Sequence, residues 1–389
     1  SLDAYVDTPW REQAQWWGDA RVQSWNTFHL SGDARLLRRG IAQIAGQTTQ
    51  EGLTYGHAPT IAHSCVLPDF TLIWFLTLWD YSWQTGSTGA FETHHDAVLG
   101  ALAYFKKNSD PKTGLVSHDD RFWLFLDWTD LHKDGVPAVY NLWLLIALER
   151  LAQLAARTKR AAESAALAKW AQKLRKSLAR LATPDGLMRD GWTAGGEIVG
   201  DTSLHAQVLG LEAGVPGLKK AAALEKLLLP YIREDKCETA PPSAYWVTYI
   251  LSFLSGGGHG KDVVDFIKRR WLPMAGHGTT WENFAPRRAD ESFSHAWSAH
   301  PLFHLMQIMG GVRQDAPAWR KITYSPVFHG DRCDTVIPTP LGLIKSKWRK
   351  VKNKVHIELA LPQGMSARAT LPGLVNKTIK GRWRAQVLL

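Results

Sequence analysis

The sequence predicts a mainly α-helical protein: an (α/α)6 barrel followed by a small C-terminal antiparallel β-sandwich. Up to about residue 312, apolar residues recur at the 3.6-residue spacing of amphipathic helices. Beyond that point, Pro317 and Pro326 interrupt the helical pattern, and short alternating runs follow. The 389 residues suffice for one large domain and a smaller one. We therefore expect the barrel at 1–312 and the sandwich at 313–389.

The helical pattern is clearest at 136–157 and 160–182, which are rich in Ala, Leu, Lys and Arg. Turn signals such as Thr183-Pro184-Asp185-Gly186 separate the segments. The other predicted helices are 9–29, 33–46, 67–85, 91–107, 201–212, 217–231, 243–255, 260–272 and 295–310. These make eleven, whereas such a barrel has twelve. We therefore expect the first barrel helix to lie upstream of residue 1.

The C-terminal segment combines predicted strands with positive charge. The strands are expected at 322–324, 334–337, 343–348, 354–361, 366–371 and 382–388. The whole chain carries a net charge of +10, while residues 313–389 hold fifteen Lys and Arg against four Asp and Glu. This excess fits a solvated sheet face or a surface for an anionic polysaccharide, a nucleic acid or an acidic membrane. Because no nucleic-acid-binding motif accompanies it, we expect no nucleic-acid partner.

Neither the cysteines nor the histidines predict a metal site. Cys65, Cys237 and Cys333 lie far apart, so we expect free thiols. His300 and His304 have the i, i+4 spacing of a zinc pair, but Pro301 stands where a zinc protease carries its glutamate. We expect no metal and no cofactor. No stretch is apolar and long enough to span a bilayer, and a missing upstream segment would favour a periplasmic or secreted location over a cytoplasmic one.

Residues 7–19 are the most informative stretch, reading Asp-Thr-Pro-Trp-Arg-Glu-Gln-Ala-Gln-Trp-Trp-Gly-Asp. With Thr8 as N-cap and Pro9 as the first helical residue, Glu12, Trp16 and Asp19 would share one helix face. Acids near a helix start also favour the macrodipole, and tryptophan is often a core residue. An indole between two carboxylates nevertheless suits a sugar, because the ring covers its apolar face and the acids take its hydroxyls.

This stretch resembles the signature of the bacterial α-L-rhamnosidases, glycoside hydrolase family 78. The matching residues are Asp7, Pro9, Arg11, Glu12, Trp16, Gly18 and Asp19. Thr8 stands where the family commonly has cysteine, and Trp10 where it commonly has glutamine. Neither change removes a carboxylate. The resemblance implies a barrel that carries the catalytic site and a β module after it.

Further strings extend the resemblance along the chain. Thr279-Thr-Trp-Glu282 is similar to the family string whose glutamate is the proposed general base, with Trp281 beside it, and Ser292–Ser298 places a substrate-facing histidine at His295. The segment from Leu67 to Trp74 resembles the helix after the first hairpin. Leu126-Asp127-Trp128 resembles a string that supplies an acid and an aromatic wall, although Asp127 also fits an N-cap and Trp128 a core position.

The resemblance implies inverting hydrolysis of a terminal α-L-rhamnoside, with Glu12 as acid and Glu282 as base. The expected substrate-binding residues are Asp7, Arg11, Trp16, Asp19, Trp74, Asp127, Trp128, Trp281 and His295. Crowding by Asp7 and Asp19 is expected to raise the pKa of Glu12 so that it keeps its proton. The expected partner is a rhamnose-containing oligosaccharide or polysaccharide, with an anionic one to be tested. Alternatives are an inactive carbohydrate-binding barrel, a glucoamylase-like hydrolase and a polysaccharide lyase.

Overall fold

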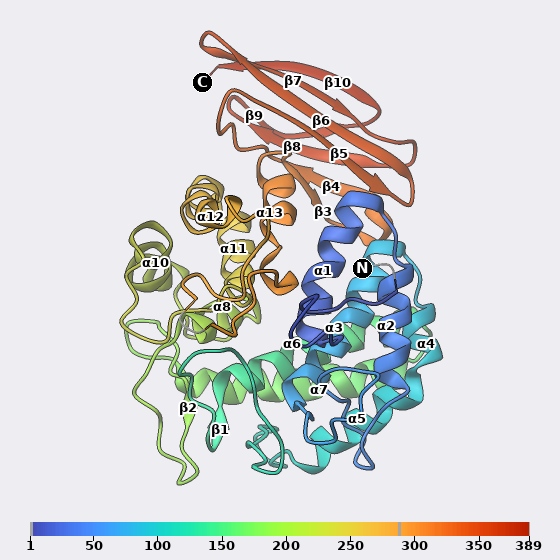
Figure 1. Ribbon diagram of the computed structural model, residues 1–389, viewed down its shortest axis with the longest axis vertical. Coiled ribbons are helices and arrows are strands. Elements are labelled where there is room, and N and C mark those ends of the chain that lie inside the picture. The colour runs from blue at the N-terminus through green and yellow to red at the C-terminus, as the bar shows by residue number, and fades with distance from the viewer. Residues whose placement is uncertain (1–2, 287–288, 389) are drawn as a thin grey trace.

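The computed structural model describes residues 3–286 and 289–388, and shows a helical domain with stacked strands at one end (Figure 1). Short connections join successive helices into hairpins, and the termini of many helices face long loops. The helices are α1 (Trp17–Ser31), α2 (Arg35–Ala45), α3 (Pro68–Thr85), α4 (Gly89–Thr93), α5 (His95–Lys107), α6 (Ala138–Arg157), α7 (Ala161–Leu178), α8 (Leu204–Glu212), α9 (Lys220–Ala223), α10 (Leu229–Glu234), α11 (Val247–Gly256), α12 (Gly260–Ala275) and α13 (Pro301–Ile308). The mainly helical, hairpin-based fold class predicted from the sequence is confirmed.

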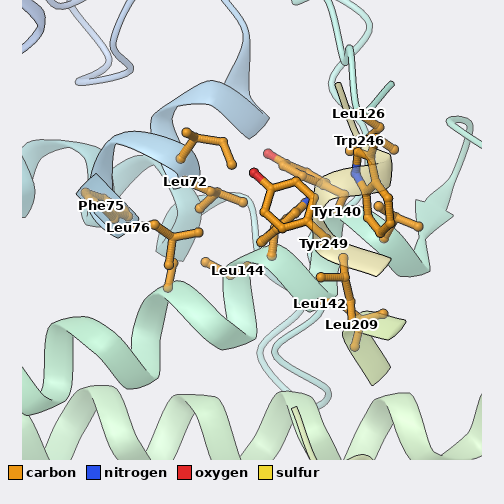
Figure 2. Packing of buried hydrophobic residues seen from close by; sticks show 14 of the residues in the cluster. Leu72, Phe75, Leu76, Leu126, Tyr140, Leu142, Leu144, Leu209, Trp246 and Tyr249 are labelled. Atoms are coloured by element: carbon orange, nitrogen blue, oxygen red, sulfur yellow. The ribbon is translucent and has the colours of Figure 1, made fainter. Parts of the chain in front are cut away.

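The helical domain has a core formed by α3, α6, α8 and α11. Figure 2 shows side chains of these helices meeting, among them Leu72, Leu144, Leu209 and Tyr249. All four side chains are buried within one continuous apolar cluster. Burying a leucine of this kind contributes about 1.5–3 kcal/mol. The helices that carry the cluster are therefore held firmly beneath the loops at their ends.

The predicted helices at 136–157 and 160–182 correspond to α6 and α7, which pack against each other. The prediction at 9–29 was wrong at its start, because α1 begins only at Trp17. The chain from Asp7 to Ala14 instead closes a loop, in which the Ala14 amide donates to Asp7 Oδ1 at 3.0 Å. Within that loop Gln13 has a φ of 54°, which is incompatible with a right-handed helix.

The C-terminal strands form two four-stranded sheets packed over a second apolar cluster. One sheet has the order β10 (Arg382–Leu388), β7 (Lys354–Ala360), β6 (Gly342–Val351) and β5 (Arg332–Thr339), all antiparallel. The other has the order β3 (Val312–Gln314), β4 (Lys321–Tyr324), β8 (Ser366–Leu371) and β9 (Leu374–Ile379). The pair β4 and β8 is parallel, which departs from the purely antiparallel sandwich expected. The strands β3 and β9 were not predicted.

Side chains also join the two domains. The Trp348 indole, buried in the strand cluster, donates to the carbonyl of Met309 at 2.8 Å, just after α13. Trp319 Nε1 donates to Gln84 Oε1 at 2.8 Å, near the end of α3. These contacts fix the strand domain against the helical domain at the end of the molecule that Figure 1 shows.

Two short strands, β1 (Val136–Pro137) and β2 (Gly191–Trp192), pair beside the start of α6. The three cysteines are free thiols. Within the described residues, no group of three or more His, Cys, Asp or Glu side chains is arranged to hold a metal ion. His300 and His304 are buried and bond instead to the Ala244 carbonyl and the Thr248 hydroxyl. Across 3–286 and 289–388, every helix is too short or too polar to cross a membrane.

Candidate active site

One pocket is lined by acidic, basic and aromatic side chains, several of which come from the first and last segments of the helical domain in sequence. It is lined by Arg11, Glu12, Trp16, Asp19, Leu67, Phe70, Trp123, Phe125, Trp128, Glu282, His295 and Trp297. Glu12 belongs to the loop before α1, and Glu282 belongs to the loop after α12. The two glutamates predicted to act together therefore face the same pocket.

The loop before α1 is held by side-chain to backbone hydrogen bonds. Thr8 Oγ1 accepts from the amides of Trp10 and Arg11 at 3.2 and 3.3 Å, so Thr8 caps a turn and not a helix. Trp16 then precedes α1 and forms an isolated β-bridge with His57. Its indole donates to Glu12 Oε2 at 2.5 Å. Glu12, Trp16 and Asp19 thus meet at the pocket through a loop and a helix start, and not along one helix face.

Arg11 bridges the two glutamates. Its Nη2 atom lies 2.9 Å from Glu12 Oε1 and 3.0 Å from Glu282 Oε1. The two oxygens are therefore at most about 5.9 Å apart, because both contact the same nitrogen. The guanidinium of Arg11 therefore lies between the expected acid and the expected base.

Glu282 is buried, with 6% of its surface exposed. Its Oε2 atom accepts from the Ser292 amide at 2.8 Å, and its own amide donates to the Ser292 carbonyl at 2.8 Å. The amide of Ser292 and the guanidinium of Arg11 therefore fix the position of the Glu282 carboxylate at the pocket.

His295 and Asp19 form a buried pair beside the glutamates. His295 Nε2 lies 3.0 Å from Asp19 Oδ1, and its Nδ1 lies 3.9 Å from Glu282 Oε2. Burial opposes a charge on His295, but Asp19 and Glu282 outweigh it and raise the pKa of the imidazole. Burial also raises the pKa of Asp19, although His295 opposes that rise. The pair thus holds a proton within reach of the base.

The surroundings of Asp7 and Glu12 shift the pKa values of the two carboxyls in opposite directions. Burial, together with the neighbouring Glu12 carboxyl, raises the pKa of Asp7 to about 7. Burial also tends to raise the pKa of Glu12, but Asp7, Trp16 and Arg11 together bring it below its ordinary value. The expectation of a raised pKa at Glu12 was wrong for this state, because a cation and two hydrogen-bond donors stabilise its charge. Two close carboxyls of this kind share one proton.

Aromatic rings also line the pocket, and one of them, Trp16, contacts Glu12 directly. The rings of Trp16 and Trp123 meet edge to face with centroids 6.3 Å apart, and those of Trp123 and Trp128 lie 5.6 Å apart. Trp123 is 39% exposed and Trp128 52%, which is unusual for tryptophan in a folded domain. Indole faces left open beside carboxylates suit the apolar face of a sugar ring.

The family model for the bacterial alpha-L-rhamnosidase 6 hairpin glycosidase domain matches residues 1–309. The chain belongs to the bacterial α-L-rhamnosidase family. The model for the C-terminal domain of the same family matches residues 311–385. No curated protein sequence matches the chain.

Solved rhamnosidases have the same fold. The family 78 enzyme of Bacillus sp. GL1 is 25% identical with a TM-score of 0.80, over 94% of this chain and 41% of its own. The enzyme of Aspergillus terreus is 19% identical with a TM-score of 0.80, and the match covers 98% of this chain and 46% of that enzyme. The Streptomyces avermitilis enzyme, solved with L-rhamnose, is 18% identical with a TM-score of 0.75. That match covers 94% of this chain and 36% of that enzyme. The chain thus spans less than half the length of these rhamnosidases.

Four residues predicted to bind substrate do not line the pocket of this rhamnosidase-family chain: Asp7, which is described below, and Trp74, Asp127 and Trp281. Trp74 is fully buried and donates to the Ile41 carbonyl at 3.3 Å, so its ring is a core side chain. Asp127 is also fully buried, and its Oδ2 atom lies 2.8 Å from His205 Nε2. Trp281 packs edge to face against His277 and Phe293, away from the pocket. The prediction of direct sugar contact is therefore wrong for Trp74 and Asp127.

Asp7 and Asp127 act from behind the pocket. Asp7 is 1% exposed, so its carboxyl reaches the site only through Glu12. Asp127 Oδ1 accepts from the amide of Trp128 at 2.8 Å, and Oδ2 accepts from the amide of Ser243 at 3.0 Å. It therefore fixes the loop that presents Trp128, while Trp128 itself lines the pocket.

Several lining residues were missed, although each lies in or just before a string on which the family resemblance rests. Leu67 and Phe70 begin the segment from which Trp74 was chosen, and the first turn of α3 rather than its middle reaches the pocket. Trp297 follows His295 by two residues and donates to the Glu282 carbonyl at 2.9 Å. Trp123 and Phe125 precede Asp127 in alternation. That alternation of aromatic residues was the available signal.

Proposed function

We propose that the chain is a glycoside hydrolase that releases terminal α-L-rhamnose from a glycan or glycoside by an inverting mechanism. The observation that carries the proposal is the convergence of Glu12 and Glu282 on Arg11 in a pocket walled by tryptophans. Family membership supports rhamnoside chemistry, as does the bound L-rhamnose reported for the Streptomyces avermitilis enzyme.

The pocket suits a deoxy sugar. Rhamnose has a methyl group at C6, where most hexoses have a hydroxyl. Leu67, Phe70 and Phe125 supply an apolar lining that offers a hydroxyl no hydrogen bond. Asp19 and Glu12 supply acceptors for the ring hydroxyls, and the indoles cover the apolar face.

In the proposed mechanism Glu12 protonates the glycosidic oxygen and Glu282 activates a water molecule. Glu12 delivers the proton that it shares with Asp7. Once the aglycone has left, the pair takes up a proton again. His295 positions Glu282 through the contact at 3.9 Å and stabilises its charge until the water is deprotonated.

Inversion requires space between the two carboxyls. Inverting enzymes hold them ~6.5–9.5 Å apart, and retaining enzymes ~5–5.5 Å apart. The Oε1 atoms of Glu12 and Glu282 are at most about 5.9 Å apart while Arg11 bridges them. We therefore propose that the sugar displaces Arg11 from one carboxylate on binding, so that the carboxylates separate and admit the water molecule.

Two measurements test the proposal. An aryl α-L-rhamnoside should be hydrolysed by the chain. On an alkyl α-L-rhamnoside, whose leaving oxygen must be protonated, Glu12→Gln and Glu282→Gln should each lose most turnover. Glu197→Gln, at an exposed glutamate, should retain it. Proton NMR of the earliest product should show the inverted anomer. Near-normal turnover in either active-site variant removes that residue from its role, and a retained anomer rules out the acid–base pairing. Binding of the glycoside without release of aryl alcohol would identify a carbohydrate-binding barrel.

A further inference from the structure

The outward face of the sheet β10-β7-β6-β5 is strongly basic. Strand pairing places Lys345, Ala360 and Arg382 in one row across three strands. The next row is Lys347, Glu358 and Arg384, and the alternation of exposed and buried residues puts both rows on the same side. Other exposed cations of this face are Arg332, Arg349 and Lys354. Its exposed carboxylates are Asp334 and Glu358.

Only part of this charge is neutralised within the sheet. Lys347 pairs with Asp334 at 2.6 Å, and Arg384 pairs with Glu358 at 3.1 Å. Within residues 3–286 and 289–388, Lys345, Arg349 and Arg382 have no carboxylate within ion-pair distance. Like charges facing one another across a sheet destabilise it, so such an arrangement is costly without a counter-charge.

The two rows also border a groove. It is lined by Lys345, Lys347, Glu358, Leu359, Ala360, Arg382, Trp383 and Arg384, and has a volume of about 600 Å³. The small side chain of Ala360 leaves the space between Lys345 and Arg382, which stand two strands apart. Two strand spacings amount to ~9.5 Å, about the length of two linked pyranose units. The cations thus recur at the spacing of acidic groups on a chain with one anion per disaccharide.

We propose that this groove binds an anionic polysaccharide bearing carboxylate or sulfate groups, as a site separate from the hydrolytic pocket. The cations would contact the anionic groups, and the floor at Ala360 would accept the sugar backbone. The aromatic residue that lines the groove is Trp383, which is half-buried with Lys377 over its ring. A single covered ring offers no platform for successive bases, which disfavours single-stranded nucleic acid. Figure 1 shows that β7 and β10 lie at the end of the molecule farthest from the helical domain, where a long polymer has free access.

The binding is tested without reference to hydrolysis. Affinity electrophoresis in gels that contain polygalacturonate, dextran sulfate or neutral dextran compares the intact chain with two charge variants. Lys345→Gln/Arg382→Gln removes both unpaired cations of the groove. Lys169→Gln/Lys176→Gln removes two exposed cations from α7, and is the control for net charge. Single-stranded DNA and vesicles with anionic lipid serve as competing ligands.

The intact chain should be retarded by at least one of the two anionic polysaccharides and pass freely through neutral dextran. The groove variant should lose about ten-fold in affinity, whereas the α7 variant should keep it. Equal losses in the two variants, absence of retardation, or tighter binding to DNA or vesicles would each overturn the proposal. Melting temperatures and aryl rhamnoside turnover should be unchanged in both variants, because neither pair lies at the pocket. A variant that melts early would be replaced by Lys345→Ser/Arg382→Ser, judged by the same outcomes.

Discussion

Replacing Asp7 by asparagine should move the alkaline limit of activity to lower pH. The Asp7 carboxyl is buried beside Glu12 and, with a pKa of about 7, holds the proton that the two groups share. Asparagine keeps the oxygen that accepts from the Ala14 amide, so the loop should remain closed. It cannot hold or release that proton, so Glu12 must then bind one on its own.

The magnitude follows from the surroundings of Glu12. The ordinary pKa of a glutamate is 4.5; burial tends to raise the pKa of Glu12, but Asp7, Trp16 and Arg11 together bring it below that value. The alkaline limb should therefore move down from the wild-type value near 7. Because each pH unit of this shift lowers the protonated fraction of the acid about ten-fold, kcat/KM at pH 7 should fall at least about ten-fold.

The assay compares two rhamnosides over pH 4–9. An alkyl rhamnoside needs its leaving oxygen protonated, whereas a nitrophenyl rhamnoside has a leaving group that departs as the anion. The loss should therefore be large for the alkyl substrate and small for the nitrophenyl substrate. Asp3→Asn, at an exposed aspartate, should leave both profiles unchanged. An alkaline limb at the wild-type position in Asp7→Asn, or equal losses on both substrates, would refute the shared-proton argument.

Three more predictions concern the wall, the loop and the histidines. Trp128→Ala should raise KM for aryl rhamnosides several-fold with a smaller effect on kcat, and Trp128→Phe should restore part of the affinity; an unchanged KM would exclude Trp128 from the binding wall. Asp127→Ala should lower the free energy of unfolding in urea by about 3–5 kcal/mol, since it leaves His205 and the Ser243 amide unpaired; a loss below about 1 kcal/mol would contradict this. Burial lowers the pKa of His29 and of His300 to about 4 from 6.5, so the unfolded chain binds protons first as pH falls, and stability should drop between pH 6.5 and 4 by on the order of 3 kcal/mol per histidine. Denaturant titrations at pH 7 and 5 measure this, and His300→Gln should flatten the dependence.

Periodicity was enough to predict most of the fold. The helices α6 and α7 bury continuous apolar stripes, so their spacing alone defined them. A helix was wrongly predicted for residues 9–16, because a capping residue followed by proline is equally compatible with a hydrogen-bonded loop. The edge strand β9 was missed because its side chains are mostly exposed and show little alternation.

The candidate site was predictable in its acids and less so in its apolar walls. Glu12 and Glu282 are carried by strings whose residue types are specific to one chemistry. Tryptophan, by contrast, serves cores and sugar surfaces equally well, which explains the error at Trp74 and the omission of Trp123. The lowered pKa of Glu12 could not be predicted, because it depends in part on Arg11, whose orientation is set by a loop more than 270 residues away.

The contacts between the first and last segments of the helical domain have a consequence for biosynthesis. Arg11 meets Glu282 across 271 positions of sequence, and Asp19 meets His295 across 276. Ribosomes make protein at ~5–20 residues per second, and domains form as units during synthesis. The nascent chain thus carries Arg11 and Asp19 without Glu282 and His295 until nearly the whole domain has emerged. Enzymatic turnover should therefore begin only after the last helices have packed against the first. Chains truncated before residue 295 should be inactive even where their helices form.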